Sequence, residues 1–462
     1  MDREPRTSPE DREGTQGPGD LAATPGPGDL AATFCATLVD EWARRGVTDA
    51  VVCPGSRNTA VSLALVGDDR LRTHVVHDER SAAFLALGLS VGSGRPVVLT
   101  CTSGSAPTHF HPAVVEADLA AVPLILVTAD RPPELQGVLA PQTIDQRDLY
   151  GTAVRWYCEP GPPAPGSSPW WRDLARDALA RACGSRPGPV QLDLAFREPL
   201  VGAVGALPEP EDPVGEPVPW SPTLAPGWNL TDEDVVRLVG ALSGRRGVIV
   251  AGARAARSDA EREPVLALAS ELGWPLLADP LSGLRVPHPA VVAAFDPVLR
   301  SGVFRSSPPE VVIRLGGLVA SRATAEWLRG GAAGAPLTLA VDRYGLCPDP
   351  DSTVAREFTC VPGEFAARLS GRGIEPAPQA WTGHWRAAGD AAAEGLREWL
   401  GGGDGKGCEE PFTAATLCDS LAAGSELVVA SSMPVRDLES YAEPRRGVRV
   451  HSNRGTNGID GS

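Results

Sequence analysis

The stretch THVVHDERSAAFLALGLSVGSGRPVVLTCTSGSA, residues 73–106, decides the fold class. It predicts a short apolar strand at 73–77, a helix that begins near Asp78, and a second apolar strand at 95–101 that ends in a small polar turn. Short strands that are apolar throughout and separated by helices are typical of a parallel sheet covered by helices on both faces. We therefore expect an α/β fold.

The same alternation continues along the chain and divides it into units. Further strands are predicted at 49–53, 122–129 and 189–196, then at 247–252, 274–279, 311–317 and 337–343, and finally at 426–431 and 448–452. We expect a disordered leader at 1–28, a first α/β domain at 29–201, a linker at 202–228, a central α/β domain at 229–370, a linker and connecting helix at 371–410, and the start of a third domain at 411–462. The helix expected after the last strand is missing, so we expect the third domain to be truncated at its C-terminus.

Composition excludes several classes of protein. The 462 residues are 42% hydrophobic, which argues against a disordered chain. The net charge is −16, which argues against a nucleic-acid partner. No apolar run reaches the ~20 residues of a membrane span, and the charged N-terminus does not resemble a signal peptide. The 9 Cys form no CxxC pair, as is typical of reduced thiols. We expect a cytoplasmic protein.

Arginines follow several predicted strands. Ligands of open α/β sheets bind beyond the carboxyl ends of the strands, and Arg57, Arg131, Arg436 and Arg454 all lie just after such ends. A guanidinium group matches a carboxylate with two parallel hydrogen bonds. Any one of these arginines could instead cap a helix or make a surface ion pair. Together they predict a pocket for a small substrate with more than one carboxylate.

Glu79 lies where a strand ends and a helix begins, which leaves two interpretations. The carboxylate could simply stabilise the helix N-terminus. It could also be a partly desolvated acid that shares a proton with a bound heterocycle. The strand at 247–252 is not followed by GxGxxG, so nicotinamide binding is not favoured. His109 and His111 form an HxH pair without an evident third ligand, so a zinc site is not favoured either.

Several strings resemble one family. CPGSR (53–57), DERSAAFLALG (78–88), TSGSA (102–106), TADRPPEL (128–135), SSMPVRDLE (431–439) and NRGTNGIDG (453–461) resemble the thiamine-diphosphate-dependent enzymes of the decarboxylase and acetolactate-synthase type, and they occur in the family's order. The resemblance implies a pyrimidine-binding domain, a central domain and a diphosphate-binding domain. It also implies a homodimer or homotetramer, because the family's active site lies between the first domain of one subunit and the third domain of its partner.

The resemblance implies a transferase reaction of menaquinone biosynthesis. 2-Oxoglutarate loses carbon dioxide, and the succinyl carbanion adds to isochorismate; both substrates carry two carboxylates. The cofactors implied are thiamine diphosphate and Mg²⁺ (or Mn²⁺). The family's metal loop lies downstream of GIDG, so no metal ligand is assigned in this sequence. Two alternatives stay open: a truncated, non-catalytic remnant that binds anionic metabolites or a partner subunit, and a relative that acts on another 2-oxo acid.

The resemblance also assigns residue roles. Glu79 matches the catalytic glutamate, which hydrogen-bonds the pyrimidine ring of the cofactor. The substrate-binding positions are Ser56, Arg57, Arg131, Gln142, Arg322, Ser432, Arg436 and Arg454. The cofactor-binding positions are Glu79, Thr102, Ser103, Gly104, Gly458 and Ile459. Two departures from the family's pattern affect these assignments: Pro141 fixes the backbone before Gln142, and His109 stands where relatives commonly have Asn.

Overall fold

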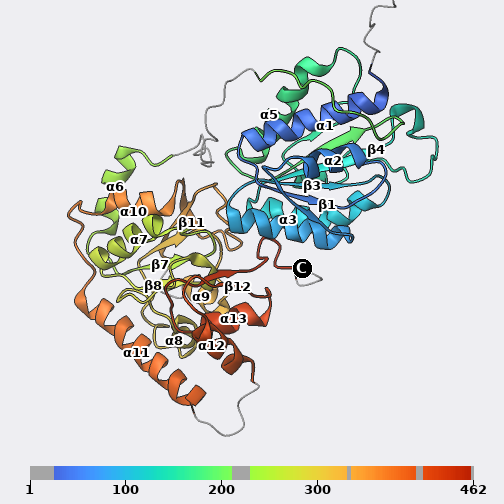
Figure 1. Cartoon of the computed structure of the whole chain (residues 1–462). Coiled ribbons are helices and arrows are strands. Elements are labelled where there is room, and N and C mark those ends of the chain that lie inside the picture. The colour runs from blue at the N-terminus through green and yellow to red at the C-terminus, as the bar shows by residue number, and fades with distance from the viewer. Residues whose placement is uncertain (1–24, 211–228, 330–334, 402–408, 459–462) are drawn as a thin grey trace, which may run out of the picture.

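The computed structural model describes residues 25–210, 229–329, 335–401 and 409–458. Its first domain contains a six-stranded parallel sheet of strand order β2-β1-β3-β4-β6-β5 (Figure 1). The strands are β1 (Asp49–Val52), β2 (Arg72–Val75), β3 (Val97–Cys101), β4 (Leu124–Asp130), β5 (Tyr157–Cys158) and β6 (Pro189–Ala195). The predicted parallel sheet flanked by helices is confirmed, and β5 is an edge strand that the sequence did not predict.

Helices cover both faces of this sheet. One face packs against α1 (Pro27–Arg44), α2 (Thr59–Gly67) and α5 (Trp171–Ala182). The other face packs against α3 (Glu79–Ser93) and α4 (His111–Ala120).

Five short 3₁₀ helices are described as well, four in the first domain and the last in the central domain: η1 (Ala106–Phe110), η2 (Pro133–Leu135), η3 (Gly151–Ala153), η4 (Ser168–Trp170) and η5 (Pro280–Ser282).

The first helix begins earlier than the sequence predicted. Pro27 occupies its first turn, where a missing N–H costs nothing. The carboxylate of Asp29 accepts a hydrogen bond from the N–H of Gly26 at 3.2 Å. Residues 27 and 28 therefore belong to α1, and the predicted disordered leader is wrong for these two positions; residues 1–24 lie outside the described part of the chain.

The central domain holds a second parallel sheet, of order β11-β10-β9-β7-β8. Its strands are β7 (Gly247–Ala251), β8 (Leu276–Ala278), β9 (Val311–Leu315), β10 (Leu337–Asp342) and β11 (Val354–Thr359). Its helices are α6 (Asp232–Leu242), α7 (Asp259–Leu272), α8 (Phe295–Arg300), α9 (Arg322–Leu328), α10 (Pro362–Leu369) and the long α11 (Gln379–Gly401). β11 is a further strand that the sequence did not predict.

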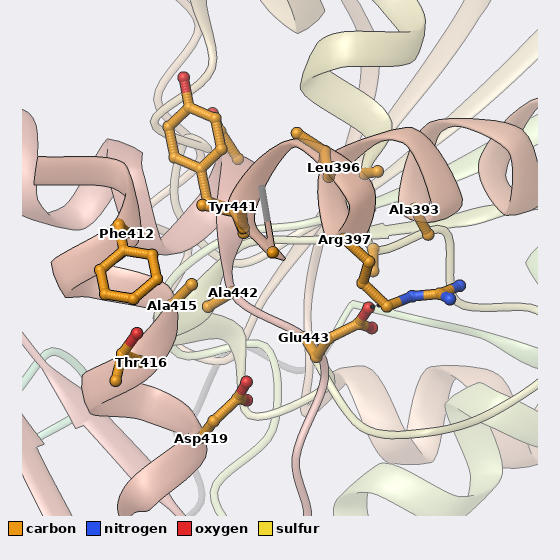
Figure 2. Close-up of a pocket in the computed structure, with 15 residues that line it drawn as sticks. Ala393, Leu396, Arg397, Phe412, Ala415, Thr416, Asp419, Tyr441, Ala442 and Glu443 are labelled. Carbon is orange, nitrogen blue, oxygen red and sulfur yellow. Dashed lines mark ion pairs between the residues drawn. The ribbon is translucent and has the colours of Figure 1, made fainter. Parts of the chain in front are cut away.

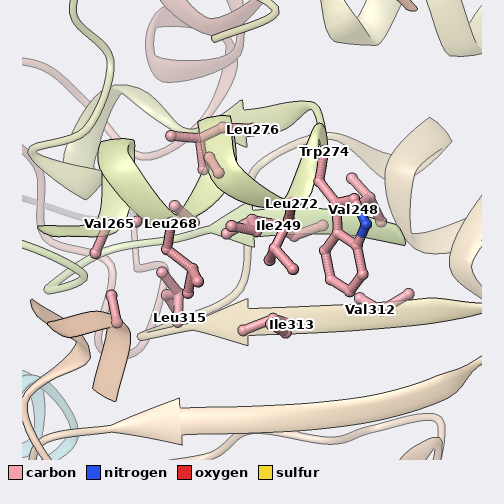
Figure 3. Close-up of a cluster of buried hydrophobic side chains, with 14 of the residues drawn as sticks. Val248, Ile249, Val265, Leu268, Leu272, Trp274, Leu276, Val312, Ile313 and Leu315 are labelled. Carbon is pink, nitrogen blue, oxygen red and sulfur yellow. The ribbon is translucent and has the colours of Figure 1, made fainter. Parts of the chain in front are cut away.

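Aliphatic side chains of strands and helices form the core of this domain. Figure 3 shows Leu272 and Trp274 lying beside Val248 and Ile249 of β7. Trp274 is fully buried, and its Nε1 donates to the carbonyl of Arg245 at 2.9 Å. Burying each such side chain contributes about 1.5–3 kcal/mol, so this cluster holds the sheet and its helices together.

The last described segment is small. It consists of α12 (Glu410–Ser420), β12 (Glu426–Val428), α13 (Met433–Tyr441) and β13 (Arg449–His451), and its two strands pair in parallel. It packs on the central domain, where the guanidinium of Arg285 donates to the carbonyls of Glu439 at 2.9 Å and Ala442 at 2.7 Å. Figure 1 shows that the chain following β13 runs up to the first domain near α3.

Candidate active site

The carboxyl ends of β1, β3 and β4 meet at one edge of the first sheet, and their loops pack tightly. A Cβ added to Gly55, in the loop after β1, would lie 2.5 Å from Cβ of Thr102, which follows β3. Gly104 has a φ of +82°, and a Cβ there would lie 2.7 Å from Cγ of Gln142. Glycine is needed at both positions, because any side chain would push the loops apart.

Arg131, Ser103 and Gln142 form one hydrogen-bonded network at this edge. Arg131 donates from Nη1 to Oγ of Ser103 at 2.7 Å and from Nη2 to the carbonyl of Pro141 at 3.1 Å. Oγ of Ser103 donates to the carbonyl of Gln142 at 3.0 Å, and Nε2 of Gln142 donates to the carbonyl of Ser103 at 3.2 Å. The structure thus brings together three of the residues that the sequence assigned to the site.

Pro141 does not turn Gln142 away from this edge. Gln142 adopts a φ of +58°, in the left-handed region that non-glycine residues rarely enter. This conformation folds the residue back over Gly104 and Ser103. Strained backbone of this kind persists where surrounding contacts determine it, and the hydrogen bonds with Ser103 provide them here.

Arg57 lies close to Arg131 but is deeply buried. Its side chain donates from Nη1 to the carbonyl of Phe196 at 2.9 Å and from Nη2 to Glu198 at 3.3 Å, both just beyond β6. Burial lowers the pKa of its guanidinium, and the charge of Arg131 lowers it further. Two mutually repelling arginines at one sheet edge make a region that attracts an anion.

Glu79 is half-buried at the first position of α3. The preceding residue, Asp78, caps this helix by accepting from the N–H of Ser81 at 2.8 Å. Burial raises the pKa of the Cys53 thiol to about 12, with a further contribution from the negative charge of Glu79. Cys53 follows β1 directly, so Glu79 lies near the strand end that leads to Ser56 and Arg57. Ser56 itself is exposed in this loop.

The third segment brings its own strand ends together. Oγ of Ser431, which follows β12, lies 3.2 Å from Oγ of Ser452, which follows β13. This contact holds the loops that carry Ser432 and Arg454 side by side. Ser432 and Arg454 are half-buried, whereas Arg436 is exposed on α13.

Glu116 of α4 connects this segment to the first domain, and the sequence analysis did not single it out. The carboxylate accepts from the N–H of Gly455 at 2.6 Å, from the N–H of Thr456 at 2.7 Å and from Oγ1 of Thr456 at 2.8 Å. Gly458 is tied to the same turn, since its N–H donates to Oγ1 of Thr456 at 3.2 Å. The only feature of the sequence that could have pointed to Glu116 is that this acidic residue lies among the apolar residues Ala113, Val114 and Ala117, which are buried.

The structure does not bring Arg322 to this edge. Arg322 begins α9 with a side chain that is 89% exposed, and its Nε donates to Glu326 at 2.7 Å, one helical turn away. Within the described chain, that arrangement is an exposed ion pair, contrary to the predicted position facing the site. Ile459 lies outside the described residues.

The residues present fit one end of the expected cofactor. The open carboxylate of Glu79 can meet a nitrogen heterocycle, and the buried hydroxyl of Thr102 has no hydrogen-bond partner within the described residues. No group of three His, Cys, Asp or Glu in the described ranges could hold a metal ion. The described site therefore suits a pyrimidine, and it holds no cluster for a metal-bound diphosphate.

A cavity of about 250 Å³ lies elsewhere, between α11, α12 and α13 (Figure 2). Arg397 and Glu443 pair at its wall at 3.5 Å. None of the predicted site residues lines this cavity, so it is separate from the sheet edge described above.

Comparison with known proteins places the chain in a family. Residues 32–149 match the thiamine pyrophosphate enzyme N-terminal TPP-binding domain, and residues 229–387 match the middle domain of thiamine pyrophosphate enzymes. The chain is 43% identical over 428 residues to a 2-succinyl-5-enolpyruvyl-6-hydroxy-3-cyclohexene-1-carboxylate synthase of Thermobifida fusca, covering 92% of this chain and 73% of that protein. The chain belongs to this synthase family.

Other members of the synthase family match over the same part of the chain. The identity is 36% to the Bacillus velezensis synthase, covering 93% of this chain and 74% of that protein. It is 38% to the Myxococcus xanthus synthase, covering 92% and 73%. The chain is therefore a thiamine-diphosphate-dependent transferase of menaquinone biosynthesis, as its motifs predicted, with the three-domain architecture of that enzyme class.

No helix in the described ranges combines the length and apolar character that crossing a membrane requires.

Proposed function

We propose that the edge of the first sheet, with Glu79, Arg57, Arg131, Ser103 and Gln142, forms the cofactor-activating and isochorismate-binding side of the synthase active site. The observation that carries this proposal is the hydrogen-bond network that holds the guanidinium of Arg131 on Ser103 and Pro141, close to a second arginine, Arg57. Isochorismate is a dicarboxylate, and a pair of guanidinium groups at a partly desolvated edge recognises such an anion.

Glu79 would act on the cofactor. When bound, thiamine diphosphate supplies the carbon nucleophile and the electron sink for decarboxylation of a 2-oxo acid. The carboxyl of Glu79 would hold a proton at a ring nitrogen of the pyrimidine, and Thr102 and Gly104 would line the same pocket.

The third segment would provide the 2-oxoglutarate side. Ser432 and Arg454 lie on adjoining loops, and Arg436 stands one turn into α13. Gly458 and Ile459, in the turn after Arg454, would contact the cofactor. Arg322 would contribute only if another subunit covers its exposed face. We propose that Mg²⁺ or Mn²⁺ accompanies the diphosphate on ligands outside the described residues.

We propose a homodimer or homotetramer that lies in the cytoplasm. Exposed apolar side chains on the elements around the edge strand β2 support a second copy as the partner: Leu63 and Val66 on α2, Val75 on β2, and Leu85 and Val91 on α3. A second copy covering this side of the sheet would bury them. The thiols of Cys35, Cys53 and Cys101 are free and buried, which agrees with a reducing compartment.

The test compares two neighbouring carboxyl-to-amide changes. Glu79→Gln keeps the shape of the side chain but cannot exchange the proton, so formation of product from 2-oxoglutarate and isochorismate, with thiamine diphosphate and Mg²⁺, should fall at least about 100-fold. Asp78→Asn is the matched control, since Asn also caps helices well, and it should keep activity within about threefold. Normal turnover of the Glu79→Gln protein would refute the assignment.

A further inference from the structure

Buried polar side chains lie near the carboxyl ends of β4 and β6, at the sheet edge that carries Arg131. In the β4–β6 register, Asp193 lies opposite Thr128, and Ala195 lies opposite Asp130. Because side chains alternate between the faces of a sheet, Thr128, Asp130 and Asp193 share one face. Asp130 and Asp193 are each 2% exposed. Two carboxyl groups thus lie side by side at the strand ends that carry the proposed pocket.

Asp130 connects these side chains to the pocket. Its Oδ1 accepts from the N–H of Arg131 at 2.7 Å, and its Oδ2 accepts from Nε2 of Gln136 at 3.1 Å. The carbonyl of Asp130 accepts from the N–H of Phe196, whose own carbonyl binds Arg57. The charge of Asp130 also acts on the guanidinium of Arg57. Asp130 therefore contacts Arg131 directly and acts on Arg57 at longer range, whereas Glu198 pairs with Arg57 directly.

Among the described residues, no cation forms an ion pair with Asp193. Its Oδ2 accepts from the hydroxyl of Tyr157 at 3.1 Å, whereas its buried Oδ1 has no partner within the described residues. Oε1 of Gln146, 1% exposed and beside Asp130, is a second buried acceptor without a partner there. A proton on Asp193 removes the cost of burying an ionised carboxylate whose second oxygen has no partner.

Burial and neighbouring charge also favour the protonated form of Asp193. Burial raises the pKa of Asp193 to about 8, and the charge of Asp130 raises it further. Burial also raises the pKa of Asp130. The titratable groups that face Asp193 are Asp130, Tyr157, Glu159, Arg147, Tyr150 and Cys101. Arg147 is held by Glu159 at 3.2 Å, so the nearest cation is already neutralised.

We propose that Asp193 is a positioning residue of the isochorismate pocket, acting through Asp130: as a neutral acid, it adds no further negative charge to the carboxylates of Glu198 and Asp130, which already lie by Arg57 and Arg131. This role rests on the proposed function of that pocket. Ionised Asp193 would add a negative charge beside Asp130, which would make the pocket less positive, and a dicarboxylate would then bind less tightly.

Isothermal titration of the purified protein with isochorismate between pH 6.5 and 9 tests the idea. The carboxylates of isochorismate stay ionised throughout this range, so a change in affinity reports on the protein. For the unmodified chain we expect a constant Kd up to about pH 7 and about tenfold weaker binding at pH 9, with a midpoint near 8.

Three variants make the result specific. Asp193→Asn, which cannot ionise, should keep tight binding up to pH 9. Tyr157→Phe should move the midpoint to higher pH, because the lost hydroxyl hydrogen bond favoured the ionised form. Asp177→Asn is the matched control: Asp177 is exposed on α5, and this variant should retain the unmodified profile.

The outcomes separate this inference from the proposed function. Absence of isochorismate binding at pH 7 in the unmodified chain would overturn the pocket, and with it the role of Asp193. Tight binding at pH 7 with an unchanged pH profile in Asp193→Asn would leave the pocket standing and overturn this inference alone. Should Asp193→Asn unfold, an unshifted midpoint in Tyr157→Phe would overturn it equally.

Discussion

Glu116 and Thr456, which are 340 residues apart in the sequence, are joined by two hydrogen bonds to a single carboxylate oxygen. The other oxygen of Glu116 accepts from the N–H of Gly455. A Cβ added to Gly455 would lie 2.7 Å from the carbonyl oxygen of Glu116, so only glycine allows this approach. The contact ties the loop that carries Arg454 to the helix pair that also presents Glu79.

This contact predicts a local effect of Glu116→Gln. The carboxylate satisfies three donors, and an amide offers one acceptor and turns an NH₂ group toward the backbone N–H groups. We expect the amides of Gly455 and Thr456 to open more easily by about 2 kcal/mol, or roughly 30-fold faster hydrogen exchange. Hydrogen exchange followed by mass spectrometry measures the change.

A matched control isolates the effect of that contact. Glu326→Gln makes the same chemical change on exposed α9, where only an i,i+4 ion pair is lost, and it should leave exchange at 455–458 unchanged. Unchanged exchange in Glu116→Gln as well would mean that the loop does not depend on this carboxylate.

Arg131 is predicted to require its guanidinium shape. It reaches Oγ of Ser103 and the carbonyl of Pro141 at once, and a lysine ammonium cannot span both groups in the same geometry. Arg131→Lys and Arg131→Ala should therefore both raise KM for isochorismate by about tenfold or more. The control is Arg197→Lys, since Arg197 pairs with Glu134 on the surface. Steady-state kinetics that give Arg131→Lys a normal KM would argue against the network.

Glu439 is predicted to make stability depend on pH. It is buried between Asp279 and Arg285, and burial raises its pKa well above the usual range, with the charge of Asp279 adding to the effect. The folded chain then keeps a proton that the unfolded chain releases above about pH 4.3. Stability contributed by this group is full below that pH and falls as pH rises toward the folded pKa.

Glu439→Gln should remove this dependence, because Gln can still donate to Asp279 but cannot ionise. The melting temperature of the variant should exceed that of the unmodified chain by a margin that grows between pH 5.5 and 8.5. Differential scanning calorimetry across this range provides the measurement. A margin that stays constant or shrinks with rising pH would contradict an elevated pKa at Glu439.

The sequence by itself determined the layered α/β architecture. Continuous apolar runs such as 97–101 and 124–130 can be buried only inside a parallel sheet with helices on both faces. The polar residues that end those runs, Ser103 and Arg131 among them, follow the same rule for strand ends. Its motifs identified the enzyme class, because they are local strings that need no knowledge of distant contacts.

Only the tertiary structure decided which distant residues meet. β5 was missed because two residues carry too little periodicity to predict a strand, yet β5 supplies Tyr157 to Asp193. The contact of Glu116 with Thr456 joins separate domains, and the exposure of Arg322 depends on how α9 packs. Such pairings follow from chain topology and burial, which the pattern of residues along the sequence does not encode. The pairings decide where the charged groups lie, and the positions of those groups determine the chemistry of the site.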